Sequence, residues 1–186
     1  MEHVVWARDL AQRLLEEPLP RRWAHTQGVA GQAATLVPLL GDDTDLVTAA
    51  AWLHDIGYSP ALAVTGFHPL DGARYLRDVE KADERLCSLV AHHSGAWVEA
   101  GERGLQDELV EEFAFPPAHL LDALTYSDMT TGPDGTRLPV ERRLAEILER
   151  YAPGDIVHRS ITRSRLALTA SVHAVEGRLS RAMRPE

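Results

Sequence analysis

The segment 42–55, DDTDLVTAAAWLHD, constrains the fold more than any other part of this sequence. Its acidic and threonine residues suit the cap and first turn of a helix. The residues that follow are apolar on almost every side, and a helix of that kind is buried all round. The sequence therefore predicts a central helix enclosed by other elements, after which Gly57 lets the chain turn.

This central helix ends in His54 and Asp55, two polar residues that need a compensating partner. A carboxylate that is buried without a partner costs several kcal/mol or becomes protonated. Three partners can prevent this: a local hydrogen bond between the two residues, an arginine, or a metal ion.

The rest of the chain also has helical periodicity. Apolar residues recur at steps of three and four, and no alternating strand pattern, internal repeat or low-complexity linker is present. Residues 21–40 form one such stretch, Pro69 suits the first position of a later helix, and TTGPDGTRLP at 130–139 predicts a loop. The sequence predicts an all-α helical bundle that forms a single domain over residues 1–186.

Composition narrows the possible functions. The chain has 186 residues, an apolar content of 45% and a single cysteine, so it can fill a core but cannot form an internal disulfide. The N-terminus lacks the apolar stretch of a signal peptide, and no run approaches the roughly 20 residues that span a bilayer. We expect a soluble, cytoplasmic protein without membrane contact. A formal charge of −9 argues against binding to long nucleic acid.

Several histidines and carboxylates fall on the core-facing sides of the predicted helices. One inward histidine is usually a hydrogen-bonded core residue. Five histidines and two carboxylates cannot easily satisfy one another, whereas imidazole and carboxylate are the ligands of Zn, Fe, Mn and Co. We therefore predict a metal site that stabilises the buried Asp55. The inward positions are His25, His54, His93 and Asp128, with His92 at the edge of its apolar stripe and His68 at a helix N-cap.

Five short motifs in this order resemble the HD-domain superfamily of metal-dependent phosphohydrolases. The resemblance covers about residues 20–131 and includes the two additional histidine motifs of its dinuclear branch. That branch contains HD-GYP cyclic-dinucleotide phosphodiesterases, whose G-Y-P element is missing here, and small bacterial diadenosine-tetraphosphate hydrolases. The motifs are RRWAHTQGVA at 21–30, AAWLHDIG at 50–57, FHPLDGARYL at 67–76, LVAHHSG at 89–95, and Asp128.

The resemblance implies a site for two divalent transition-metal ions. Iron or manganese is expected first, with cobalt, nickel and zinc as alternatives. Helical phase favours His93 over His92, but the family pattern leaves room for both. The first ion would be bound by His25, His54, Asp55 and Asp128, and the second by Asp55, His68 and one or both of His92 and His93.

The function implied is hydrolysis of a phosphate ester or anhydride in a small nucleotide-like molecule by a metal-activated hydroxide. Asp55, His54 and Arg22 would be the catalytic residues. Arg22 could hold a substrate phosphate, or it could support a ligand carboxylate. The candidates for substrate binding are Arg74, Arg77 and Thr131.

Three parts of this interpretation have alternatives. The same ligand order occurs in HD-type mixed-valent di-iron oxygenases, which act on small organic substrates. A binding module with a degenerate site is disfavoured because every expected ligand is present. The stretch 94–116 suits either a substrate lid or an acidic surface segment, while residues 139–186 read as packing helices. The oligomeric state stays open.

Overall fold

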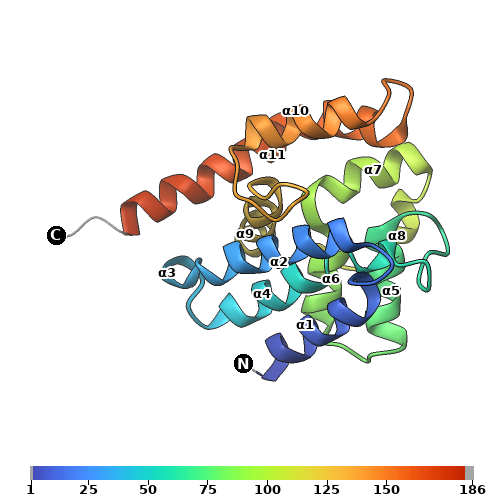
Figure 1. Cartoon of the computed structure of the whole chain (residues 1–186), viewed down its shortest axis with the longest axis horizontal. Coiled ribbons are helices and arrows are strands. Elements are labelled where there is room, and N and C mark those ends of the chain that lie inside the picture. The colour runs from blue at the N-terminus through green and yellow to red at the C-terminus, as the bar shows by residue number, and fades with distance from the viewer. Residues whose placement is uncertain (1, 183–186) are drawn as a thin grey trace.

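The computed structural model describes residues 2–182, which form helices with short connections and no β-strand beyond one isolated bridge, Thr131–Arg137 (Figure 1). This confirms the all-α prediction. The helices are α1 (Glu2–Leu15), α2 (Pro20–Ala34), α3 (Val37–Leu40), α4 (Thr44–Leu53), α5 (His68–Asp78), α6 (Glu84–His92), α7 (Ala96–Arg103), α8 (Gln106–Glu112), α9 (Ala118–Met129), α10 (Val140–Arg150) and α11 (Ile156–Ala182), with 3₁₀ turns at Gly41–Asp43, Ile56–Tyr58 and His93–Gly95.

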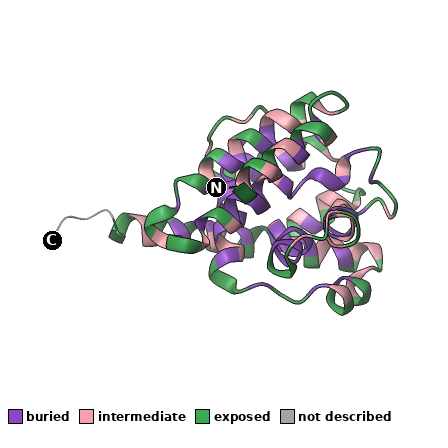
Figure 2. Ribbon diagram, turned by 90° about the horizontal axis from the view of Figure 1, so that it is seen from below, coloured by how far each residue is buried: buried purple, intermediate pink, exposed green. Residues whose placement is uncertain are grey.

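Helix α4 is the buried centre of the bundle. It packs against α1, α2, α6 and α9, and its Val47, Ala50 and Leu53 side chains have no exposed surface. Figure 2 shows buried residues concentrated on the inner sides of the surrounding helices. The C-terminal part of α11 extends beyond the rest of the bundle (Figures 1 and 2). Among the described residues, no helix is both long and apolar enough to cross a membrane.

Three local predictions differ in detail from the structure. The helical stretch 21–40 is divided in two, since α2 ends at Ala34 and α3 begins at Val37. Pro38 lies in the first turn of α3, where its missing backbone N–H is tolerated, whereas it would break a continuous helix. His68 was predicted to be the N-cap of this helix, but it is the first residue of α5, and Phe67 is the N-cap. The irregular stretch 94–116 folds into the short helices α7 and α8.

The turn after α4 makes a close backbone approach to α5 at Gly57. A Cβ atom at this position would lie 2.0 Å from the carbonyl oxygen of His68 and 2.7 Å from the backbone nitrogen of Gly72. Only glycine allows the two backbones to come this close. Gly57 therefore fixes the start of α5, and with it His68, beside Asp55.

A second close approach joins the 130–139 loop to α2. A Cβ at Gly28 would lie 2.3 Å from the carbonyl oxygen of Gly135, and Gly135 itself has a φ of +80°, which L side chains rarely adopt. The loop is held against α2 by this contact. It places the carbonyl of Gly132 within 3.0 Å of the His25 ring.

The contact at Gly57 predicts a large effect for Gly57→Ala. Because the new methyl group would meet backbone atoms that cannot rotate away, we expect the free energy of unfolding to fall by about 3 kcal/mol or more. Gly31→Ala is the matched control: it lies in α2, its Cβ would meet nothing within 4 Å, and alanine should raise stability by up to about 1 kcal/mol. Urea denaturation measures both values. Equal stabilities would contradict the proposed role of Gly57.

Candidate metal centre

Two groups of potential metal ligands lie side by side at the core of the bundle. The ligand atoms within each group lie within 4.8 Å of one another, and five of the six residues are buried. The residues come from five separate segments of the chain, which the packing around α4 brings together. The first group is His25, His54 and Asp128, and the second is Asp55, His68 and His93.

Hydrogen bonds to the backbone fix the orientation of three histidine rings. A carbonyl oxygen can only accept, so in each ring Nδ1 donates and Nε2 is the atom that can bind a metal once it is deprotonated. Such bonds are typical of histidines that bind metals. The Nδ1 contacts are His25 with Gly132 (3.0 Å), His54 with Ala51 (2.8 Å) and His93 with Val90 (2.7 Å).

The Nε2 atom of His54 is the clearest sign that a ligand belongs in this site. It is buried and makes no hydrogen bond with any described residue. A buried polar atom without a partner carries a large desolvation penalty. A metal ion would satisfy this atom, since it could also bind the ligand atoms of His25 and Asp128, which lie within 4.8 Å.

The carboxylate of Asp55 lies between the two groups. Its Oδ2 is 3.3 Å from His54 Nε2 and 3.9 Å from His25 Nε2, while its Oδ1 is 3.3 Å from His68 Nε2. One carboxylate oxygen thus faces each group. This arrangement suits a carboxylate that is shared by two ions.

The remaining contacts also converge. Nε2 of His25 lies 3.1 Å from Oδ1 of Asp128 in the first group, and Nε2 of His68 lies 3.2 Å from Nε2 of His93 in the second. Four imidazoles and two carboxylates form a donor set that suits zinc, iron, manganese or cobalt. The residues present therefore fit divalent transition metals.

The ionisation states agree with this assignment. Burial alone would raise the pKa of Asp55, but the charges of Arg22 and then His54 outweigh it and hold that pKa well below its usual range. Burial lowers the pKa values of His68 and His93, which favours the neutral imidazoles that bind metals. The second group thus presents an ionised carboxylate and two neutral rings, whereas the charge of Asp55 raises the pKa of His54 in the first group.

Comparison with known proteins identifies the family. Residues 22–154 match the HD domain family, which is most of the chain. The chain belongs to the HD-domain family. No solved structure matches it.

Two curated proteins share part of their sequence with this HD domain. A tRNA (cytidine(56)-2'-O)-methyltransferase of Thermoplasma volcanium is 36% identical over 93 residues, which are 50% of this chain and 25% of that protein. Ribonuclease Y of Rhodopirellula baltica is 30% identical over 125 residues, 67% of this chain and 21% of the relative. The chain spans about a quarter or less of the length of these relatives.

Arg22 is in direct contact with the HD-domain site. Its Nη1 binds Oδ2 of Asp55, and its guanidinium stacks 3.6 Å above the ring of Tyr58. Tyr58 in turn stacks on His68, with ring centroids 3.9 Å apart. Of the two roles predicted for Arg22, its contacts are those of a residue that supports a ligand carboxylate.

His92 lies outside both ligand groups, although it precedes His93 directly. Its Nε2 donates a hydrogen bond to the carbonyl of Phe113 (2.8 Å), and its ring stacks on Phe115. The reason is the end of α6 at His92, after which His93 begins a 3₁₀ turn and points the other way. The structure thus brings one histidine of this pair to the centre.

None of the three residues predicted to bind substrate lines the cavity at the ligand groups. Arg74 and Arg77 both pair with Glu112 of α8, and Arg74 also reaches Glu108. Thr131 is buried and donates its hydroxyl hydrogen to the carbonyl of Ser127 (2.7 Å). Their partners account for these side chains without a substrate.

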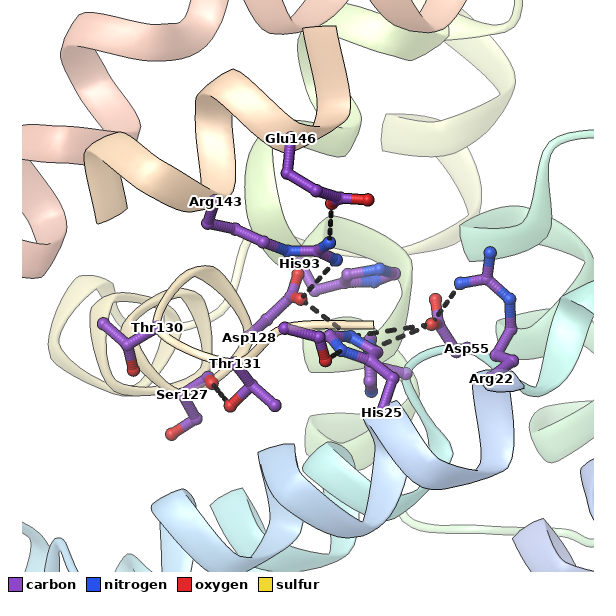
Figure 3. A network of polar contacts seen from close by, with 12 residues as sticks. Arg22, His25, Asp55, His93, Ser127, Asp128, Thr130, Thr131, Arg143 and Glu146 are labelled. Atoms are coloured by element: carbon purple, nitrogen blue, oxygen red, sulfur yellow. Dashed lines mark hydrogen bonds and ion pairs between the residues drawn. The ribbon is translucent and has the colours of Figure 1, made fainter. Parts of the chain in front are cut away.

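Arg143 is a site residue that the sequence analysis missed. It reaches from α10 over His93 and Asp128 (Figure 3), and its Nη2 lies 4.0 Å from Oδ1 of Asp128. The side chain is 9% exposed. Its spacing from Val140 and Ile147 places it on the apolar side of α10, which is the signal that could have revealed it.

The geometry predicts opposite effects for the two adjacent histidines. His93→Ala should lower the metal content from about two ions per chain toward about one, because it removes an Nε2 directed at the second group. His92→Ala should leave the metal content unchanged, since that ring faces Phe113. Elemental analysis of the folded fraction measures both. Loss of metal from His92→Ala alone would overturn this assignment.

Proposed function

We propose that this HD domain is a metal-dependent phosphohydrolase that cleaves a phosphate ester or anhydride of a small, nucleotide-like substrate. The observation that carries the proposal is the carboxylate of Asp55, which presents one oxygen to each of two converging ligand groups. Two divalent ions bound there would activate a water molecule and neutralise charge on the phosphoryl oxygens. Family membership supports the same reaction class.

The chain's own residues would prepare the site for this reaction. The Nδ1 bonds hold the histidine rings before any ion binds, so little reorganisation is needed. Arg22 keeps Asp55 ionised and in place. A small cavity of about 90 Å³, lined by Asp55, His68 and Asp128 among others, gives a phosphate group access to both ligand groups.

A small substrate fits this chain better than a long RNA. Ribonuclease Y acts on RNA by its name, but the region shared with it is only 21% of that protein. A chain with a formal charge of −9 offers little attraction to a polyanion. We therefore propose small phosphorylated compounds as substrates and a cytoplasmic location, where such compounds are available.

An oxygenase with two iron ions is the second candidate. The donor set of four imidazoles and two carboxylates suits iron as well as it suits manganese, so the ligands themselves do not separate the two reactions. The identity of the substrate and the requirement for oxygen distinguish the oxygenase reaction from the hydrolase reaction.

Asp55→Asn tests the shared carboxylate. The substitution keeps the side-chain volume and removes the charge that faces both groups, so we expect loss of both ions and at least about 1000-fold lower hydrolysis. Circular dichroism should still show a helical protein. Asp122→Asn is the control, because Asp122 pairs with Arg178 outside the site. Near-normal turnover by Asp55→Asn would exclude this residue from the centre.

A substrate screen tests the reaction class. Nucleotides, dinucleotides and phosphomonoesters are incubated with the protein and Mn, Fe, Co, Ni or Zn, and phosphate release is measured with and without oxygen. We expect release that requires metal, stops with chelator and needs no oxygen. If no compound in this panel releases phosphate and an iron-loaded sample takes up oxygen, the oxygenase is favoured.

A further inference from the structure

A second cavity of about 310 Å³ lies directly outside the metal centre. Four residues line both this outer cavity and the inner one: Arg22, His25, Arg143 and Arg150. A molecule in the outer cavity therefore lies one side chain away from the ligand groups. The rest of its wall includes Arg21 and a rigid apolar surface of three prolines and Leu19.

The charges around the outer cavity are predominantly positive. Four arginines line it, and none of its lining residues is acidic. Arg143 and Arg150 both pair with Glu146, at positions i, i+3 and i+7 along one face of α10, and Arg143 also lies 4.0 Å from Asp128. Arg21 interacts electrostatically with Asp134, an exposed carboxylate that does not line the cavity. Each of the four arginines thus has a carboxylate nearby, but none of these carboxylates lines the cavity itself.

Arg143 carries an unused hydrogen-bond donor. Its Nε is buried and has no partner among the described residues, and its side chain is only 9% exposed. A buried guanidinium with an open donor is costly unless an anion completes its bonds. Figure 3 shows this side chain between Glu146 and Asp128, above His93.

We infer that the outer cavity binds a second phosphate group of the substrate, next to the phosphate that reacts at the metal centre. This inference rests on the proposed phosphohydrolase function. Guanidinium groups bind phosphate oxygens in pairs, which suits a cavity lined by several arginines. Compounds with two or more linked phosphates are then preferred over monoesters, and Arg143 and Arg150 determine this specificity.

Binding of a non-hydrolysable analogue tests the inference without catalysis. The probe is adenosine 5′-(α,β-methylene)diphosphate, compared with AMP, which lacks the second phosphorus group. Isothermal titration calorimetry is run on the chelator-treated protein. We expect the diphosphate analogue to bind the unaltered chain at least about tenfold more tightly than AMP, because each charge-assisted bond is worth a factor of this size.

Two variants test the arginines, with one matched control. Arg150→Ala and Arg21→Ala should each lower the affinity for the analogue about tenfold, so that it approaches the affinity for AMP. Asp134, which interacts electrostatically with Arg21, is exposed and keeps its hydrogen bonds from Thr136 when Arg21 is removed. Arg178→Ala is the control: Arg178 and Asp122 are 34% and 28% exposed, close to the 32% and 30% of Arg150 and Glu146. Arg178→Ala should change neither the affinity for the analogue nor the affinity for AMP.

The outcomes separate this inference from the proposed function. Equal binding of AMP and the analogue by the unaltered chain, or equal behaviour of Arg150→Ala and Arg178→Ala, would overturn the inference even if hydrolysis is observed. Preferential binding that depends on Arg150 and Arg21 would support it even if no substrate in the panel is hydrolysed. With an active enzyme, Arg150→Ala should also lower the ratio of kcat/KM for a nucleoside diphosphate over a monoester about tenfold.

Discussion

The burial of the Asp55 carboxylate is the constraint on which the rest of the structure depends. A single negative charge at the centre of a helical bundle is unfavourable by itself. It is accommodated because α2 directs Arg22 and His25 toward it, and the start of α5 directs His68 toward it. The apolar helix α4 makes this possible, since it packs against α1, α2, α6 and α9 and ends at Leu53, directly before His54 and Asp55.

Backbone contacts set the positions of these polar groups. Gly57 lets the start of α5 approach the turn after α4, which puts His68 on one oxygen of Asp55. Gly28 lets the 130–139 loop reach α2, which puts a carbonyl on Nδ1 of His25. In both cases a residue without a side chain determines where a functional side chain lies. The precision of the site therefore comes from the packing of rigid elements.

Helical periodicity made the fold and much of the candidate site predictable. The helical spacing of apolar residues predicted that four side chains face inward, and these lie together in the structure: His25, His54, His93 and Asp128. It could not reveal contacts between distant segments. Arg74 and Arg77 lie on α5 near His68, but Glu112, far along the chain, holds both. Arg143 was read as part of a packing helix because its neighbour Asp128 comes from another element.

Under the proposed function, the net negative charge of the chain and the arginine-lined cavity would act on different classes of anion. Exposed charges more than about 8–10 Å apart are largely screened at physiological ionic strength, so a small anion in the cavity experiences mainly the nearby arginines. A long polyanion would also lie along the rest of a chain whose formal charge is −9. Under the proposed function, the local field would attract small phosphates, while the overall charge would repel nucleic acid. We therefore propose that charge distribution, as well as the dimensions of the cavity, selects small substrates.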